Sequence, residues 1–447
     1  MVARGSDFAI DQVDMNVRKI LLLPLFVAAF ACGQRGEEAK KQVSTVATKT
    51  KEKVAEAFDV SSPEERQRAQ PNPQDVERQR FDEQWRQLQS FREQQAALQQ
   101  QQQQSQQQTS TAASTLQFVE ANKKNRESFK NMELDAINAA PLRVPISGDL
   151  KGPSVLKTQV WLDRLRFSVG ALDGRWGRNS AISVWWWQRT HGLEATGEAD
   201  EATLRSIANA AGAAPALVRH TLTDDDVKGP FVSIPEDVYE KEHLDCLCYE
   251  SLLEKLGERF HVTQDFLQEL NPEVRFSSLS AGQTIVVPNV REPNTTEVHD
   301  VAKIVVSISG NTLNAFDASG RLLFHAPTTV GSKYDPSPNE ETKVVGVARN
   351  PHFHYQPTLF HEVPDTDPEA HLNPGPNSPV GVVWMALAKP HFGIHGTSDP
   401  ESIGYASSHG CVRLTNWDAA ELAYHVQPGV VVSFVDTRKG DVPPVAQ

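Results

Sequence analysis

The 447-residue chain lacks an excess of positive charge, and its N-terminal apolar run is too short to span a membrane. Its 44 lysines and arginines are outnumbered by 57 aspartates and glutamates, which gives a formal net charge of −13. Proteins that bind nucleic acid need basic patches, so this balance argues against nucleic acid as a partner. The apolar run at residues 20–31 is shorter than the about 20 residues of a membrane-spanning helix. The length predicts about three structural units.

The glutamate of the zinc-peptidase motif is missing as well. A single His-x-x-x-His spacing occurs, from His391 to His395, and phenylalanine stands where the motif has glutamate. Pro390 disfavours the helix that would align the two imidazole rings. The closely spaced pair His352 and His354 would need a distant third ligand. We therefore expect neither a metal nor a cofactor.

Residues 15–32 have the pattern of a secretory signal peptide, with a short basic stretch, an apolar run and then Cys32. Cys32 stands where a bacterial lipoprotein carries its lipid, although the preceding Ala29-Phe30-Ala31 suits ordinary cleavage equally well. We expect an exported, periplasmic protein that is anchored to the outer membrane through a lipid on Cys32. Residues 1–14 are interpreted as an extension ahead of the true start.

Cys246 and Cys248 are separated by one residue. They can pair in an oxidising compartment, although so short a loop is tight. A second pair of zinc ligands at a suitable spacing does not accompany them. Two buried or free thiols are an equally acceptable interpretation, so these cysteines are assigned no role.

Residues 33–145 are rich in glutamine and charged side chains, and residues 99–108 are almost pure glutamine. Such a composition buries too little apolar surface to offset the loss of chain entropy on folding. Phe81, Trp85 and Leu88 fall at helical spacings, so part of the segment is expected to be helical. We expect a disordered or partly helical tether that carries the folded part away from the membrane.

Residues 146–215 are predicted to form a compact three-helix domain, because turn signals separate three segments with helical spacing of apolar residues. The segment resembles the peptidoglycan-binding-domain fold through Asp173-Gly174-Arg175-Trp176-Gly177, Trp187-Gln188, Gly192-Leu193, Thr196-Gly197 and Asp200-x-x-Thr203-Leu204. The resemblance implies binding to the cell wall. The run Trp185-Trp186-Trp187 is as compatible with packing as with ligand stacking.

Residues 235–290 predict two short helices followed by a strand. The signals are Leu252, Leu256, Phe260, Leu267, Leu270-Asn271-Pro272 and Leu279-x-x-Gly282-Gln283-x-Ile285-x-Val287-Pro288. The segment resembles a degenerate LysM module, a fold that elsewhere binds N-acetylglucosamine chains. Because the opening strand of such a module is poorly marked here, sugar binding and mere spacing stay equally open.

Residues 300–437 change to a β pattern. Strands are expected at 303–308, 312–317, 321–326, 344–347 and 430–435, the last closing the series, and a helix at 417–425. The chain is therefore predicted to be multidomain, with a mostly-β domain preceded by a small three-helix domain and a small α+β module.

The most informative stretch is Ile394-His395-Gly396-Thr397 followed by Ser407-Ser408-His409-Gly410-Cys411-Val412-Arg413-Leu414. A cysteine is a good nucleophile only as its thiolate, and a neighbouring imidazole that takes the proton is a common way to produce one. Glycine beside each histidine lets a substrate backbone approach closely, and Gly410 frees the turn that presents Cys411. The stretch therefore predicts a catalytic site.

The pattern His-Gly-x(11)-Ser-His-Gly-Cys-hydrophobic-Arg resembles that of the YkuD-like L,D-transpeptidases, cysteine-dependent enzymes that remodel peptidoglycan. The wider context resembles the Gram-negative branch of the family through Pro374-Gly375-Pro376-Asn377, Pro379-Val380-Gly381, Trp384-Met385-Ala386-Leu387 and Asn416-Trp417-Asp418. The resemblance covers roughly residues 302–435. It implies a mostly-β catalytic domain, and the chain departs from the family pattern at residues 337–341, where a Pro-x-Gly turn is usual.

The resemblance also implies roles for the residues of the pattern. Cys411 is the implied nucleophile and His395 its general base, with the backbone carbonyl of Gly396 orienting the imidazole. His409 is expected near the developing oxyanion, to which the backbone N–H groups of Gly410 and Cys411 donate. Cys411 would attack the meso-diaminopimelate carbonyl of a tetrapeptide stem, release D-alanine and pass the acyl group to an amine.

Arg413, Ser408 and Trp384 are candidates for substrate contact. Arg413 shares the face of Cys411 on an extended strand and matches a substrate carboxylate, with a structural salt bridge as the alternative. Ser408 is equally well interpreted as a turn hydroxyl. Trp384, together with Tyr405 and Trp417, is a candidate for lining the cleft, although such aromatic residues more often belong to the core.

Three classes of function stay open. The favoured one is an L,D-transpeptidase that forms 3-3 crosslinks or attaches an envelope protein through a lysine amine. The second is an L,D-carboxypeptidase or other wall hydrolase that uses water as acceptor on the same scaffold. The third is a non-enzymatic wall-anchoring lipoprotein, against which the intact Cys411, His395 and His409 argue. Expected partners are peptidoglycan stem peptides and glycan, the membrane through the lipid, and an envelope protein as acceptor.

Overall fold

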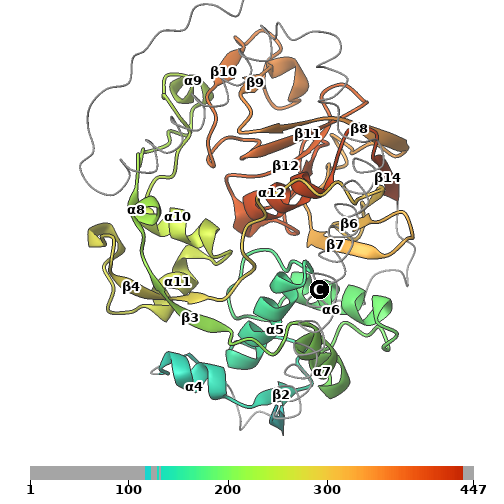
Figure 1. Ribbon diagram of the computed structural model, residues 1–447. Helices are drawn as coiled ribbons and strands as arrows, with labels where there is room; N and C mark the ends of the chain where they lie inside the picture. The colour runs from blue at the N-terminus through green and yellow to red at the C-terminus, as the bar shows by residue number, and fades with distance from the viewer. Residues whose placement is uncertain (1–115, 122–127, 130–131, 436–447) are drawn as a thin grey trace, which may run out of the picture. The chain divides into compact units, whose positions relative to one another are not determined.

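The computed structural model describes residues 116–121, 128–129 and 132–435. The expected signal peptide, its upstream extension, Cys32 and most of the expected tether lie outside these residues. The described residues form a helical domain, an α+β module and a β-rich domain (Figure 1). The multidomain fold predicted from the sequence is therefore confirmed. Within the described part of the chain, no helix is long and apolar enough to cross a membrane.

Three helices build the first domain: α5 (Pro153–Arg164), α6 (Arg178–Thr190) and α7 (Glu201–Ala210). Helix α7 begins where the side chain of Asp200 accepts the backbone N–H of Thr203, which satisfies one of the donors that a helix start leaves free. Trp185 and Trp187 in α6 are 3% and 2% exposed. Two of the three consecutive tryptophans are therefore core residues.

A short segment that was expected to be tether packs onto this domain. Strand β1 (Phe118–Glu120) pairs in parallel with β2 (Leu142–Val144), and helix α4 (Leu134–Ala139) lies between them in the chain. Ile137 and Leu142 are buried in the core that the three helices form. The expectation of a tether up to residue 145 is therefore wrong for its last part. The overall composition of residues 33–145 is polar, and the few apolar side chains near its end did not change that average.

The α+β module pairs strand β3 (Leu217–Thr221) antiparallel with β4 (Thr284–Pro288), with Leu217 opposite Pro288. Between them lie helices α10 (Leu252–Arg259) and α11 (Gln264–Leu270), which follow the predicted order of two helices and a strand. The smaller elements of the module are α8 (Asp224–Val227), α9 (Val238–Lys241) and the 3-10 helix η2 (Phe276–Ser278). The opening strand that the sequence marked poorly is β3, and it lies ahead of the expected range of 235–290.

Cys246 and Cys248 form a disulfide in the segment that leads into α10. Leu247 between them is fully buried against Ala370 and Leu372 of the β-rich domain. Its backbone N–H donates to Pro374 O at 3.0 Å. The disulfide therefore lies where the module packs against a loop of the β-rich domain, which is a position that the spacing of the two cysteines did not reveal.

One eight-stranded sheet, in the order β13-β12-β11-β8-β14-β5-β6-β7, forms the β-rich domain. In chain order its strands are β5 (Lys303–Ser307), β6 (Thr312–Phe316), β7 (Leu322–Pro327), β8 (Glu341–Arg349), β11 (Val383–Leu387), β12 (Gly393–His395), β13 (Val412–Arg413) and β14 (Val431–Val435). The remaining elements are the pair β9 (Phe353–Tyr355) and β10 (Ala370–Leu372), the 3-10 helices η3 (Pro357–Leu359) and η4 (Pro400–Ser402), and helix α12 (Asn416–His425).

The predicted antiparallel series of the first three strands is confirmed by the pairing of β5 with β6 and of β6 with β7. Strand β14, which was expected to close the series, instead lies inside the sheet, parallel to β5 and antiparallel to β8. The predicted helix at 417–425 is α12, and Thr415 caps it by accepting the N–H of Asp418.

Arg291 joins the helical domain to the β-rich domain through two buried carboxylates. Its Nη1 lies 2.6 Å from Asp163 Oδ2 and its Nη2 lies 2.7 Å from Asp418 Oδ1. His261 of the module also contacts Asp163, at 2.8 Å. Burial alone would raise the pKa of Asp163, but Arg291 and His261 lower it to about 2. Asp163 is therefore ionised, and it contacts the module through His261 and is linked to the β-rich domain through Arg291.

Candidate active site

The candidate site lies at the edge of the eight-stranded sheet, where β12 runs parallel to β13. Ile394 pairs with Val412, and His395 pairs with Arg413. Ile394 and Val412 are fully buried in the core of the domain. Because side chains alternate along a strand, His395 and Arg413 face the other side. Cys411, two residues before Arg413, shares that face, so the register brings together the three residues that the sequence predicted.

His395 is buried and held in one orientation. Its Nδ1 donates to Gly396 O at 2.6 Å, so its Nε2 is left without the proton and is available as an acceptor. The ring stacks on Trp384 at a centroid distance of 5.3 Å. Burial, helped by the charge of Arg413, lowers the pKa of His395 to about 3, although the bond to Gly396 opposes the shift. The imidazole is therefore neutral at ordinary pH.

Cys411 is half-buried and is the only free cysteine among the described residues. Its Sγ lies 3.5 Å from His391 O. Burial raises the pKa of the Cys411 thiol, while the backbone of Gly393 and the charge of Arg413 lower it by less. No hydrogen bond joins Cys411 to His395 in the described part of the chain. Catalytic hydrogen bonds are often long in free enzymes and tighten once substrate binds.

The turn before Cys411 requires glycine at position 410. Gly410 has φ +102°, and a Cβ there would lie 2.8 Å from the ring of Phe392. Ser408 accepts the N–H of Gly410 at 3.2 Å and donates to Cys411 O at 2.6 Å. Ser337 donates to Gly410 O at 2.8 Å. The hydroxyl of Ser408 therefore bridges two backbone groups of the turn.

Arg413 is a half-buried cation without a salt bridge among the described residues. Its Nε is buried and has no hydrogen-bond partner in that part of the chain. An unpaired buried N–H costs about 1–3 kcal/mol, so a vacant guanidinium face favours an anionic ligand. The structural salt bridge that was the alternative for Arg413 is absent from the described residues.

His409 points to a different set of groups. Its Nε2 lies 2.6 Å from Glu362 Oε1, and its ring meets the edge of Phe360 at 5.0 Å. His361 and Asp335 complete a cluster whose possible ligand atoms all lie within 4.8 Å of one another. Sequence reasoning missed this cluster because it considered histidine pairs close in the chain, whereas these residues come from separate loops.

Two residues behind His395 were also missed as parts of the site. Asn416 Oδ1 accepts the backbone N–H groups of Val382 and Thr397, each at 3.2 Å. Its Nδ2 donates to Glu258 on α10 at 2.8 Å. Asn416 thus fixes the backbone next to the base, and Glu258 fixes Asn416. The sequence marked Asn416 only as part of a resemblance, and nothing near Glu258 in the sequence points to the site.

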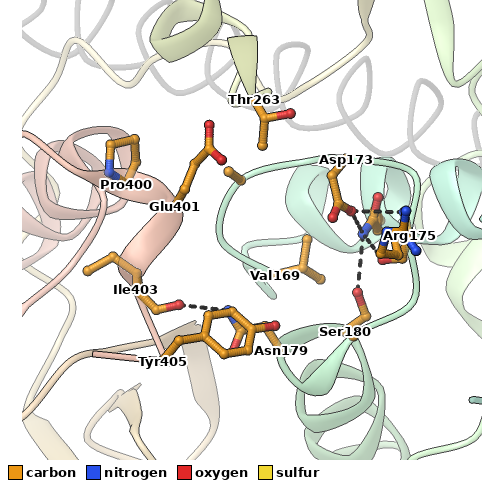
Figure 2. Close-up of a pocket in the computed structure, with 13 residues that line it drawn as sticks. Val169, Asp173, Arg175, Asn179, Ser180, Thr263, Pro400, Glu401, Ile403 and Tyr405 are labelled. Carbon is orange, nitrogen blue, oxygen red and sulfur yellow. Dashed lines mark hydrogen bonds between the residues drawn. The ribbon is translucent and has the colours of Figure 1, made fainter. Parts of the chain in front are cut away.

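Trp384 lies beside the base, but the other two aromatic candidates lie elsewhere. Trp417 is 9% exposed and stacks on His261 of the α+β module. Tyr405 is 63% exposed. It lines a separate cavity of about 100 Å³, which Figure 2 shows between residues of the helical domain, such as Asp173 and Asn179, and Glu401. Tyr405 and Trp417 are therefore parts of domain junctions in this structure.

Comparison with known families gives two matches. Residues 302–433 match the family YkuD, described as "L,D-transpeptidase catalytic domain". Residues 151–207 match the family PG_binding_1, described as "Putative peptidoglycan binding domain". The first range covers the eight-stranded sheet, except the last two residues of β14, together with the candidate site, and the second covers the three helices except the last turn of α7.

Individual relatives carry the same name. A protein of Bacillus licheniformis named "Putative L,D-transpeptidase YkuD" is 34% identical over 182 residues, which are 41% of this chain and 92% of that protein. Its counterpart in Bacillus subtilis is 32% identical over the same shares of both chains. Among solved structures, L,D-transpeptidase 3 from Mycobacterium tuberculosis aligns with 36% of this chain and 77% of its own, at 17% identity and a TM-score of 0.26.

Proposed function

This chain belongs to the YkuD family of L,D-transpeptidases, acyltransferases that act on peptidoglycan, and on that premise we propose that Cys411 is its acyl-accepting nucleophile. The observation that carries the proposal is the state of His395. Its Nδ1–H is engaged by Gly396 O, and its Nε2 is an unprotonated acceptor on the face that Cys411 shares. Such an imidazole serves as a general base for a neighbouring thiol.

The first half-reaction forms a thioester. The Cys411 thiol gives its proton to Nε2 of His395 as Sγ attacks the meso-diaminopimelate carbonyl of a donor tetrapeptide stem. The backbone N–H groups of Gly410 and Cys411 are proposed to donate to the developing oxyanion once Gly410 leaves Ser408, and His409 supports them once it leaves Glu362. When the tetrahedral intermediate collapses, the C–N bond to the terminal D-alanine breaks. The imidazolium of His395 protonates the leaving amine, and free D-alanine departs.

The second half-reaction restores the enzyme. An acceptor amine attacks the thioester carbonyl and forms a new amide while the C–S bond breaks. His395 takes the extra proton of the amine and returns a proton to the Cys411 thiolate. A diaminopimelate amine of a second stem as acceptor gives a 3-3 crosslink, and a protein lysine gives an attached envelope protein.

Arg413 is the proposed anchor for a carboxylate of the donor stem. The support is its buried Nε without a partner in the described part of the chain, together with its position opposite His395 on the shared face. A guanidinium matches a carboxylate with two parallel hydrogen bonds. Trp384, which stacks on His395, is proposed to keep water from the base rather than to bind the substrate directly.

The upstream parts are proposed to bring the catalytic domain to the wall. The helical domain belongs to a peptidoglycan-binding family by its matched residues. The LysM-like module at 235–290 is proposed to bind glycan or to act as a spacer. Cys32 is proposed to carry a lipid that anchors the protein to the outer membrane, on its periplasmic side. The peptidoglycan-binding-like domain is proposed to span residues 146–215, and the catalytic domain residues 300–437.

The test uses the full chain, the Cys411→Ala variant and a Cys32→Ala control that removes a thiol outside the described residues. Each is incubated with a disaccharide-tetrapeptide, and the products are followed by mass spectrometry. The expected product is a dimer that has lost one D-alanine, formed by the wild type and by Cys32→Ala but not by Cys411→Ala. Tripeptide as the only product would make water the acceptor and the protein a hydrolase. Dimer formation by Cys411→Ala would overturn the proposed nucleophile.

A further inference from the structure

Four possible metal ligands meet beside the turn that carries Cys411. They are Asp335, His361, Glu362 and His409, and one ligand atom of each lies within 4.8 Å of all the others. His361 Nδ1 lies 2.7 Å from Asp335 Oδ2 and 3.2 Å from Glu362 Oε2. His409 Nε2 lies 2.6 Å from Glu362 Oε1. Two imidazoles and two carboxylates thus form one continuous cluster.

The donor set fits a zinc-type cation. Zn²⁺ takes four ligands from imidazole nitrogen and carboxylate oxygen, at about 2.0–2.2 Å each, so that neighbouring donor atoms stand roughly 3.3 Å apart in a tetrahedron. Three pairs of these groups are in direct contact, at 2.6 to 3.2 Å, and the four ligand atoms all lie within 4.8 Å of one another, so the set brackets the separation that zinc requires. Ca²⁺ and Mg²⁺ prefer six or more oxygen ligands, which two imidazoles do not provide.

The ligands come from three segments, two of which are tied together already. Asp335 lies in the loop between β7 and β8, and His409 lies in the turn before Cys411. The backbone N–H of Ser332 donates to Ser408 O at 3.1 Å, which fixes the first segment to the second. His361 and Glu362 follow η3 on an exposed loop. Its side chains already form ion pairs with Asp335 and His409, and a shared metal ion would hold it to both of them more firmly.

Aromatic rings support the outer half of the cluster. The ring of Tyr334 stacks on His361 at a centroid distance of 5.6 Å, and Phe360 meets His409 edge-on at 5.0 Å. Such neighbours restrict the rotation of the two imidazoles and exclude some water from the cluster. Restricted ligands lose less entropy when a cation binds, so the packing favours metal binding over four free side chains.

We propose that Asp335, His361, Glu362 and His409 bind one zinc ion, which clasps the loop of residues 360–362 to the turn of Cys411 and slows acylation of the enzyme. The ion occupies the imidazole of His409 and holds Phe360 and Glu362 next to the turn. Zinc binding to these four residues does not depend on the proposed function. The slower acylation of Cys411 rests on the proposed function. This cation is not catalytic, so it differs from the metallopeptidase centre that the sequence argued against.

The binding test titrates the metal-free full chain with zinc chloride in a calorimeter. Wild type is expected to bind one ion, and His361→Ala and Glu362→Gln are each expected to bind it at least about tenfold more weakly. Cys411→Ser is expected to bind as wild type does, because no thiolate belongs to the site. His354→Ala is the matched control, since His354 is also exposed and paired with a carboxylate, Glu369, at 2.8 Å. Wild-type affinity in both His361→Ala and Glu362→Gln, or loss of binding in Cys411→Ser, would overturn the proposal.

A second measurement tests whether zinc holds the loop of residues 360–362 against the turn of Cys411, and it does not depend on enzyme activity. The rate at which iodoacetamide alkylates Cys411, followed by peptide mass spectrometry, is expected to fall several-fold when zinc saturates the wild type and to stay constant in His361→Ala. Co²⁺ in place of zinc is expected to give a four-coordinate visible spectrum without a thiolate charge-transfer band. An unchanged alkylation rate in zinc-saturated wild type would show that zinc does not hold the loop against the turn. A thiolate charge-transfer band would show that Cys411 itself is a ligand, which would overturn the proposed site.

Discussion

Glu258 on α10 accepts a hydrogen bond of 2.8 Å from Nδ2 of Asn416, the first residue of α12. The other end of the same amide accepts the backbone N–H of Thr397, next to the carbonyl that orients His395. Gly396 has no room for a side chain there, because a Cβ would lie 2.2 Å from Asn416 Oδ1. One carboxyl of the α+β module is thus linked through a single side chain to the position of the base.

Replacing Glu258 with glutamine is expected to flatten the pH dependence of stability. Burial raises the pKa of Glu258 from 4.5 to about 8, although the bond from Asn416 lowers it. A carboxyl whose pKa is raised by folding stabilises the protein when protonated, and this contribution is lost as pH rises from about 4.5 to about 8. The difference in unfolding free energy between wild type and Glu258→Gln should shift by a few kcal/mol over that range, in favour of the variant.

Denaturant unfolding followed by tryptophan fluorescence at several pH values measures this difference. Glu194→Gln is the control, because Glu194 is exposed and its replacement is expected to change nothing. Parallel pH curves for wild type and Glu258→Gln would mean that the carboxyl titrates normally in the folded protein.

Asn416→Ala is expected to lower kcat much more than it changes KM. The variant leaves the N–H groups of Val382 and Thr397 without their acceptor, and each such group costs about 1–3 kcal/mol when buried. The backbone beside His395 then shifts. Asn373→Ala is a matched control, since Asn373 also bridges the module and the β-rich domain, through Leu244 O at 2.8 Å, but has no link to the base. Equal activity of the two variants would remove Asn416 from the support of His395.

Gly410→Ala is expected to inactivate the enzyme, whereas Gly429→Ala is not. Both glycines have φ +102°, so alanine at either position carries a similar backbone cost of about 1–3 kcal/mol. Only at position 410 does the new Cβ meet another group, the ring of Phe392 at 2.8 Å, while position 429 opens to free space. The melting temperatures of the two variants report the backbone strain that both share. Their activities report the displacement of the turn, which is expected in Gly410→Ala only. Similar activity in both would show that the turn tolerates the shift.

The reactivity of Cys411 is expected to rise with pH only above the ordinary range of a thiol, because burial raises its pKa. No inflection from an imidazole is expected near neutral pH, since the pKa of His395 is about 3. Arg413 lowers both pKa values, so Arg413→Gln should move the whole profile to higher pH while Arg413→Lys leaves it near that of the wild type. Alkylation rates measured across the pH range check this. A Gln variant with the wild-type profile would contradict the electrostatic role of Arg413.

Local patterns made much of the β-rich domain predictable. The alternating run that became β5, its partner β6 and the helix capped by Thr415 each depend on residues that are neighbours in the chain. The location of β14 between β8 and β5 was not predictable in the same way. A strand of apolar, β-branched residues fits an edge or an interior equally well by pattern, and long-range packing decides between them.

The same division applies to the site. Cys411, His395 and Arg413 were found because they lie within one short stretch, and the register of β12 with β13 brings them to one face. Glu258 and the zinc-ligand cluster were missed because tertiary folding alone brings their members together. Their chemistry depends on burial and on partners that are far away in the sequence, which no local spacing records.

The proposed mechanism passes the acyl group through a thioester on Cys411. The most direct test is intact-protein and peptide mass spectrometry of the full chain, mixed with a disaccharide-tetrapeptide donor and quenched in acid before an acceptor is added. The expected product is an adduct of the donor minus D-alanine on the peptide that contains Cys411, removable by hydroxylamine and absent from Cys411→Ala. An adduct on another residue, or release of D-alanine at the wild-type rate by Cys411→Ala, would contradict it.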